Sequence, residues 1–213
     1  MRISIISLGS MAVTCLLGQA FSAQAAIDLT PEINEYISDG TKFQQLIFHE
    51  NDQRIEYELP HGWTFHRRDA ALHLQPPDKK SAEAVIEAAA LGGPQPLNEN
   101  VRKELKDKFV AGLPVGSQSV KIEQQIESPL LLSGNPTFEI VVSYQWIGEK
   151  WCKSALFVNM GNSQLTFTCT ARKDDFSQTH QQFRTSILSW QRVEPVKQAT
   201  QSADPTAQVA LTH

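Results

Sequence analysis

The sequence predicts an α+β fold in which helices pack on an antiparallel β-sheet. Three observations support this class. Strand-like runs with alternating apolar and polar residues are separated by short turn-forming segments. Two longer segments repeat apolar residues at helical spacing. The strands and helices do not alternate in the βαβ order of a parallel sheet, so the sheet is expected to be antiparallel.

The N-terminal part of the domain favours a short helix over Pro31–Asp39. Thr30 can act as its N-cap, proline suits the first helical position, and Gly40 suits the end. Beyond this segment, apolar residues recur at every second position, as in antiparallel strands. Three such runs follow, with turns between them: Ile55–Leu59, Trp63–Phe65 and Leu72–Leu74.

The middle of the chain contains one ambiguous segment and one clear helix. Ser81–Leu91 is rich in Ala and Glu, which favours helix, but its short length before Gly92-Gly93-Pro94 also allows a strand. Leu97–Ala111 repeats apolar residues at every fourth position, and Asn98 can cap it. We therefore expect a helix there with one apolar stripe.

The second half of the chain predicts a meander followed by a helix. A strand near Val120–Ile126 is followed by three runs with tight turns at Gly148–Lys150 and Gly161–Ser163. The final helix is expected over Phe176–Trp190, with Asp175 in a start that resembles a capping box. The three runs of the meander are Phe138–Ile147, Trp151–Met160 and Leu165–Ala171.

Residues 1–25 have the pattern of a secretory signal peptide. Arg2 supplies the positive start, an uncharged apolar run follows, and Ala23-Gln24-Ala25 matches the A-x-A cleavage site. A transmembrane anchor is the alternative, but it needs about 20 apolar residues, and polar residues interrupt this shorter run. Lipid attachment at Cys15 is a second alternative, although the residues before it do not fit a lipid-modification site.

The remaining chain is expected to be a periplasmic or secreted protein without a transmembrane segment. Residues 26–193 predict a single α+β domain. Residues 194–213 predict a disordered tail, because they are rich in Ala, Gln, Thr and Ser and contain no aromatic residue. The signal does not distinguish the periplasm from full secretion.

The charge balance argues against a nucleic-acid partner. Without residues 1–25 the chain has 18 Lys and Arg residues against 23 Asp and Glu residues, a net charge of −5. Binding to a phosphate backbone needs clustered Lys and Arg side chains. The pairs Arg67-Arg68 and Lys79-Lys80 are isolated, so they are expected to be solvated loop charges.

Cys152 and Cys169 lie in consecutive strand-like runs. If Gly161-Asn162 is a two-residue turn, position 152 lies opposite position 171, and Cys169 is its diagonal neighbour on the same face. Diagonal Cβ atoms are too far apart for an ideal disulfide, so a bridge needs a one-residue change of register. Export to an oxidising compartment favours the bridge, and two buried free thiols are the alternative.

The order of these elements and two short motifs resemble the PsbP-like and DcrB-like superfamily, which includes the Ran-binding Mog protein. Residues 59–63, LPHGW, are similar to its LP-x-GW opening. The terminal helix has the similar pattern F-x6-F-x2-S-I, starting at Phe176. The middle helix and the long meander also fit, and the resemblance covers most of Arg54–Trp190.

This resemblance implies an α-β-α sandwich with a central antiparallel β-sheet, in which Ser81–Leu91 is a strand. It implies binding or accessory roles rather than catalysis. The superfamily has no shared catalytic motif, so the resemblance carries no functional residue to this chain.

The chain contains no GxSxG elbow, P-loop, HExxH motif or GxGxxG motif after a strand. His61, His66 and His73 lie in one stretch of strands and turns, and the last two could hold a metal if they pair in register. The simpler interpretation is two solvent-facing histidines. Cys152 paired with His180 is conceivable as a nucleophile. No cofactor is expected.

Trp146 and Trp151 flank a tight turn and can form a cross-strand pair. If one is exposed at the hairpin tip, it becomes a partner contact, because aromatic anchors dominate interface energies. The sequence therefore favours an exported, non-enzymatic accessory or binding protein whose partner is a protein or an envelope component. A metal or small-ligand binding protein and a hydrolase with a dispersed site are the alternatives.

Overall fold

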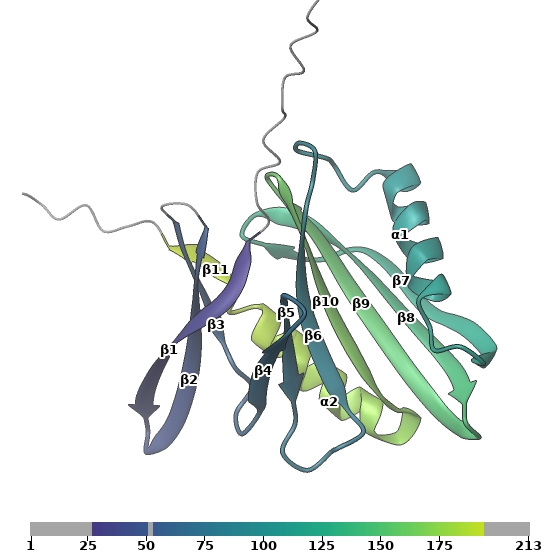
Figure 1. Ribbon diagram of the computed structural model, residues 1–213, viewed down its shortest axis with the longest axis horizontal. Helices are drawn as coiled ribbons and strands as arrows, with labels where there is room; N and C mark the ends of the chain where they lie inside the picture. Colours follow the sequence, from purple (N-terminus) through teal and green to yellow (C-terminus); the bar gives the residue numbers. More distant parts are fainter. Residues whose placement is uncertain (1–26, 51–52, 194–213) are drawn as a thin grey trace, which may run out of the picture.

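The computed structural model describes residues 27–50 and 53–193 (Figure 1), which form two antiparallel β-sheets and two helices. The larger sheet has the strand order β4-β5-β6-β10-β9-β8-β7, and the smaller sheet has the order β1-β2-β3-β11. The strands of the larger sheet are β4 (Thr64–Arg68), β5 (Ala71–Gln75), β6 (Glu83–Ala90), β10 (Ser163–Arg172), β9 (Glu149–Met160), β8 (Asn135–Trp146) and β7 (Gln118–Leu132). Those of the smaller sheet are β1 (Asp28–Ser38), β2 (Thr41–Glu50), β3 (Gln53–Glu58) and β11 (Gln191–Val193).

The mixture of sheet and helix confirms the α+β class, but the molecule is not a single central sheet between helices. The smaller sheet lies beside the larger one, at the end of the molecule opposite α1 (Glu99–Ala111) (Figure 1). The larger sheet lies between α1 and α2, but the four-stranded smaller sheet beside it is not part of an α-β-α sandwich, so the expected sandwich describes only part of the architecture. The difference arises at the N-terminal segment, where a strand replaces the expected helix.

The predicted helix over Pro31–Asp39 is wrong, because this segment forms most of strand β1. A two-residue turn at Asp39-Gly40 joins β1 to β2, with φ angles of 49° and 73°. Positive φ at both positions is typical of the type I′ turn that connects hairpin strands. The rings of Tyr36 and Phe43 stack across the two strands at 5.4 Å. Gly40, which the sequence places at a helix end, instead forms the turn of a hairpin.

Helices α1 and α2 (Lys173–Ile187) pack on opposite faces of the larger sheet. On β9, Phe157 belongs to the apolar cluster that includes α1, whereas Cys152 and Leu156 belong to the cluster that includes α2. Figure 1 shows α2 passing behind β6 and β10, while α1 lies beside β7 and β8. The alternation of side chains along a strand thus divides the interior into two apolar clusters.

Trp190 connects the two sheets. Its ring stacks on Phe48 of β2 at 5.4 Å and meets Phe167 of β10 edge to face, also at 5.4 Å. The ring of Tyr57 on β3 lies 5.9 Å away. The indole is 1% exposed. Offset and edge-to-face aromatic contacts add to the stability that area burial provides, so this residue joins both sheets in one apolar cluster.

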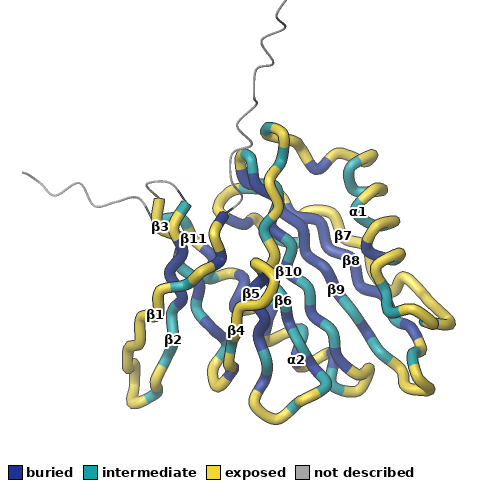
Figure 2. Tube along the Cα trace, viewed as in Figure 1, coloured by how far each residue is buried: buried dark blue, intermediate teal, exposed yellow. Residues whose placement is uncertain are grey.

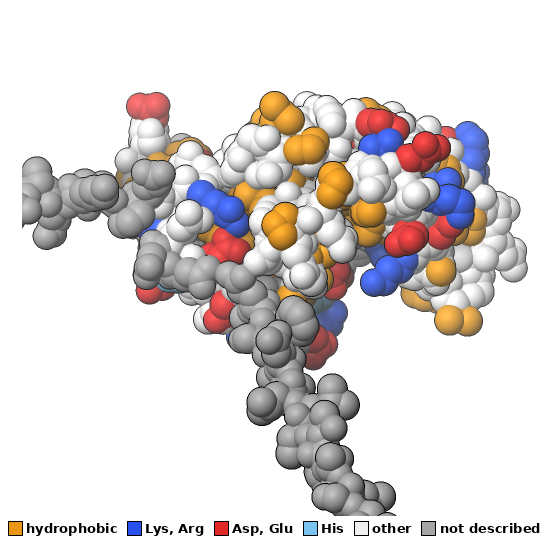
Figure 3. Space-filling view, turned by 90° about the horizontal axis from the view of Figure 1, so that it is seen from above, with side chains coloured by type: hydrophobic (Ala, Val, Ile, Leu, Met, Phe, Trp, Pro, Cys, Tyr) orange, Lys and Arg blue, Asp and Glu red, His pale blue; other side chains and the backbone are white. Residues whose placement is uncertain are grey.

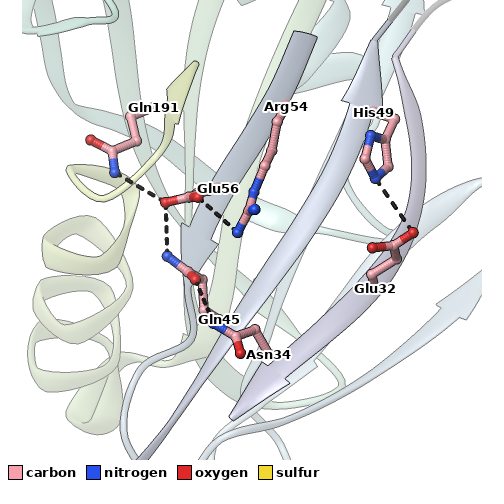
Figure 4. A network of polar contacts seen from close by, with 7 residues as sticks. All are labelled: Glu32, Asn34, Gln45, His49, Arg54, Glu56 and Gln191. Atoms are coloured by element: carbon pink, nitrogen blue, oxygen red, sulfur yellow. Dashed lines mark hydrogen bonds and ion pairs between the residues drawn. The ribbon is translucent and has the colours of Figure 1, made fainter. Parts of the chain in front are cut away.

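A ladder of polar side chains crosses the smaller sheet (Figure 4). The amide of Asn34 donates to Gln45, and Gln45 donates to the carboxylate of Glu56 at 3.0 Å. Gln191 also donates to Glu56, and Arg54 forms an ion pair with it at 2.9 Å. Each of the four strands contributes to this ladder. It supports the strand register, because cross-strand pairs stabilise a sheet.

The ambiguous segment Ser81–Leu91 is a strand, since β6 pairs with β10 over its whole length. Helix α1 begins as predicted, because the side chain of Asn98 accepts a hydrogen bond from the backbone of Val101 at 3.0 Å. Helix α2 begins earlier than predicted. Asp175 does not cap it and instead binds the ammonium of Lys79 at 2.8 Å.

Buried residues are concentrated in the central strands of the larger sheet (Figure 2). Buried residues dominate β8, β9 and β10, whereas β7 is exposed along most of its length. Figure 3 shows acidic and basic side chains mixed over the α1 end of the molecule. In residues 27–50 and 53–193, no helix is long and apolar enough to cross a membrane. The predicted signal peptide and the predicted tail lie outside the described residues.

Candidate functional site

A pocket of about 590 Å³ lies between α2 and the strands β7, β8 and β9. We call it the α2 pocket. Its walls combine apolar side chains with a few polar ones, and its size falls within the range of small-ligand sites. Its lining includes Leu130, Val141, Cys152, His180, Gln181, Arg184 and Leu188.

A buried carboxylate organises the helical wall of the α2 pocket. Glu139 on β8 is 2% exposed. Because a carboxylate only accepts, His180 donates from Nε2 to one carboxylate oxygen, 3.0 Å away. Arg184 reaches the other oxygen at 3.3 Å. Both partners offset the cost of burying the charge.

The spacing along α2 places these groups together. Phe176, His180 and Arg184 recur at every fourth position and share one helix face. The ring of Phe176 stacks on the imidazole of His180 at 5.0 Å, with 10° between the planes. The imidazole is therefore held between an aromatic ring and a carboxylate, which fixes its orientation.

Glu123 on β7 adds a second carboxylate to the rim. Lys121 donates to it at 2.7 Å and Ser143 donates at 2.6 Å. These two hydrogen bonds lower the pKa of Glu123, so this carboxylate stays ionised at neutral pH.

The structure brings Cys152 and His180 into the same pocket without joining them. No hydrogen bond links the thiol to the imidazole among the described residues. Burial raises the pKa of Cys152, which the nearby Lys173 partly offsets. A thiol is a good nucleophile only as the thiolate, so this pair lacks the activation that a cysteine hydrolase needs.

Cys152 and Cys169 are both buried and free, so the disulfide that the sequence allowed between them is not formed. The predicted register is confirmed: Cys152 lies opposite Ala171, and Cys169 lies opposite Ser154. The two thiols are therefore diagonal neighbours, too far apart for ideal disulfide geometry. Burial also raises the pKa of Cys169 to about 12.

Two of the three candidate metal-binding histidines come together. His66 pairs directly with His73 across β4 and β5, and their rings stack at 5.1 Å. Nδ1 of His73 lies 2.7 Å from a carboxylate oxygen of Glu83. His61 lies elsewhere, with its ring 6.1 Å from that of Phe43. The described part of the chain contains no group of three or more His, Cys, Asp or Glu residues placed to hold a metal.

Trp146 and Trp151 form the expected pair, with ring centroids 6.1 Å apart in an edge-to-face arrangement. Both are partly buried against the α1 cluster, and the indole nitrogen of Trp151 has no hydrogen-bond partner among the described residues. The hairpin turn itself is Ile147-Gly148, and Ile147 is 78% exposed. The structure thus places an isoleucine at the tip and the tryptophans behind it.

Sequence reasoning did not identify Glu139 and Arg184. A signal for Glu139 exists, because it is the single charged residue in the apolar run from Phe138 to Val142. Charged residues are almost never fully buried unless they are paired. The four-residue spacing from His180 to Arg184 is the matching signal on the helix.

The comparisons with known proteins support the fold. No protein-family model and no curated protein match the chain. The solution structure of cyanobacterial PsbP (CyanoP) from Synechocystis sp. PCC 6803 matches with a TM-score of 0.50 and 12% sequence identity, over 87% of this chain and 99% of that one. The fold is PsbP-like. This confirms the fold relationship that the sequence motifs implied.

Two further solved structures are similar at lower scores. LpqN, involved in cell envelope biogenesis of Mycobacterium tuberculosis, has a TM-score of 0.48 and 14% identity, over 72% of this chain and 92% of that one. A protein from Bacteroides thetaiotaomicron VPI-5482 has a TM-score of 0.44 and 13% identity, over 65% of this chain. The match spans 45% of that protein's length. Fold does not determine function, so these similarities assign no activity to this chain.

Proposed function

We propose that this chain is an exported, non-enzymatic accessory protein that binds a protein or an envelope component through the α2 pocket. Export is inferred from residues 1–25, which carry the signal-peptide pattern. The binding role is inferred from the pocket itself.

The observation that supports binding is the pairing of Glu139 with both His180 and Arg184. Both side chains bind the carboxylate of Glu139, which holds the pocket wall in one geometry. A rigid, preorganised wall favours recognition, because little conformational entropy is lost when a partner binds. The protonated Cys152 thiol next to it does not favour the hydrolase alternative.

The composition of the pocket indicates what kind of group it recognises. The side chain of Arg184 is 39% exposed, and its guanidinium has more donors than Glu139 occupies. Apolar surface surrounds it, from Leu130, Val141 and the 62% exposed Leu188. This combination fits a segment that presents an apolar side chain together with a carboxylate or carbonyl acceptor.

In-cell photo-crosslinking tests the proposal. A photo-reactive residue at Gln181, in the pocket, should give an adduct of defined mass, whereas one at the exposed Glu104 on α1 should not. Arg184→Gln should reduce the Gln181 adduct at least fivefold, and the matched control Lys150→Gln, at the exposed start of β9, should not. Equal adducts from both probe positions, or an adduct unaffected by Arg184→Gln, would contradict the proposal.

Metal binding is the second candidate, because His66 and His73 pair in register as a two-histidine site requires. A metal-bound histidine usually donates its other ring nitrogen to a carboxylate, and Glu83 lies in that position beside His73. Zinc should then raise the melting temperature of the wild type and of His61→Gln, but not of His66→Gln. A wild type that zinc does not stabilise would exclude this candidate.

A further inference from the structure

We propose that the groove between α1 and the adjacent strands binds an amphipathic monocarboxylate, with Lys153 as the cation that anchors the carboxylate. The groove lies on the face of the larger sheet opposite α2 and has a volume of about 380 Å³. It is independent of the α2 pocket and of the function proposed there.

Lys153 is a partly buried cation with no carboxylate of a described residue within ion-pair distance. It lies on β9 between Val142 of β8 and Thr170 of β10. Its ammonium sits 5.3 Å from the centre of the Phe109 ring. It makes no ion pair and no hydrogen bond with any described residue. A charge taken out of water needs a partner to offset the cost of desolvation, and a bound carboxylate would supply it.

The walls of the groove suit a ligand with one polar end. Leu105 and Phe109 of α1 and Phe157 of β9 provide apolar surface. Thr166 of β10 adds a hydroxyl that makes no hydrogen bond with a described residue. An apolar chain can therefore lie along the aromatic side chains while its carboxylate reaches the ammonium of Lys153.

The surrounding charges favour a single negative charge on the ligand. Lys108 at the rim adds a second cation. Glu87, which also lines the groove, and Glu83 lie close enough to act on Lys153, and they repel further negative charge. Desolvation lowers the pKa of Lys153, and the two glutamates partly offset this by favouring the charged form. A carboxylate suits this balance better than a phosphate, which carries more charge.

Titration calorimetry with octanoate tests the proposal. Octanoate should bind the wild type saturably, and 1-octanol, which lacks the charge, should bind at least tenfold more weakly. Lys153→Met should weaken octanoate binding at least tenfold. The matched control Lys150→Met, on the same strand but exposed at the turn, should leave it unchanged. Arg184→Gln should also leave it unchanged, which separates this groove from the α2 pocket.

A second measurement uses the wild-type protein and so does not require that the Lys153 variant folds. Reductive methylation with ¹³C-formaldehyde keeps the lysine charge and gives each lysine a methyl resonance. Octanoate should shift the Lys153 resonance and leave that of Lys150 in place. The proposal is overturned if octanoate does not bind the wild type, if octanol binds as well as octanoate, or if the Lys153 resonance and the affinity of Lys153→Met are both unchanged.

Discussion

The hydroxyl of Tyr57 donates a hydrogen bond to the side-chain oxygen of Ser186 at 2.7 Å, in the interior of the molecule. The direction follows from the next contact, because the Ser186 hydroxyl donates to the carbonyl of Phe183, also at 2.7 Å. The pair links β3 of the smaller sheet to α2, which packs on the larger sheet. It is thus a buried polar connection between these two parts, which also meet through apolar side chains and through the Arg67–Asp28 ion pair nearer the surface.

Tyr57→Phe should lower the free energy of unfolding by about 1 kcal/mol, because it removes one buried hydrogen bond without leaving a large cavity. Urea unfolding of the wild type, Tyr57→Phe, Ser186→Ala and the double variant measures this. The two single effects should not add, since both remove the same bond. Additive effects would mean that the bond contributes nothing to stability.

The thiols should be free in the purified protein and unreactive while it is folded. Both are buried, and burial raises the pKa of each, so the reactive thiolate is scarce. Ellman's reagent should detect almost no thiol in the native protein at pH 8 and two thiols per mature chain in guanidinium. Detection of no thiol after unfolding would show that Cys152 and Cys169 are bridged in solution.

Stability should fall at alkaline pH, in part because of Cys169. Its pKa is about 12 in the folded state against an ordinary value of 9.0, so the folded state holds the proton more tightly. The stabilisation is complete below pH 9 and is lost as the pH rises toward 12, at about 1.4 kcal/mol per pH unit. Urea unfolding at pH 8 and pH 10.5 should show a smaller decline for Cys169→Ala than for the wild type. An equal decline would exclude this contribution.

The tryptophan pair should matter for stability, because both rings pack on the α1 cluster. Trp146→Ala and Trp151→Ala should each lower the free energy of unfolding by on the order of 2 kcal/mol, from lost burial. Ile147→Ser, at the exposed tip, should change it by less than about 0.5 kcal/mol. Thermal melts combined with partner capture distinguish a packing role of the tryptophans from a role as partner contacts. If the tryptophan variants melt normally but lose capture, the rings are partner contacts, as the sequence suggested.

The turn at Ile147-Gly148 depends on its glycine. Gly148 has a φ of 77°, and an added Cβ would meet nothing within 4 Å, so any cost of substitution is conformational. Gly148→Ala should therefore lower the free energy of unfolding by about 1 kcal/mol. Gly92→Ala is the matched control, because that position is equally open and has no positive φ. Equal effects of the two substitutions on chemical denaturation would refute this explanation.

The meander was predictable because period-two patterns and tight turns are local signals. Gly161-Asn162 set the register that places Cys152 opposite Ala171, and the structure has that register. Pro31–Asp39 was not predictable in the same way. Its capping residues suit a helix, but the stacking of Tyr36 on Phe43 and the pairing with β2 depend on a neighbouring strand. Tertiary contacts override weak local propensity.

The candidate site was predictable only in fragments. His180 and Cys152 could be named from the sequence, but their shared pocket depends on how α2 crosses the sheet. Glu139 pairs with His180, which lies 41 positions later in the chain, and with Arg184, one helical turn further on. A long-range ion pair leaves no periodic signal, so the traces of it in the sequence are the charge within an apolar strand and the spacing of His180 and Arg184 on the helix.

The pairing of β11 with β3 has a consequence for the order of assembly. Gln191 lies opposite Glu56, 135 positions earlier in the chain. Three strands of the smaller sheet are synthesised among the first described residues, yet the fourth emerges only at the end of the described chain. The smaller sheet therefore cannot gain its fourth strand before residues 191–193 have been synthesised. Contacts this distant along the chain slow folding, so the edge of β3 stays unpaired until β11 is available.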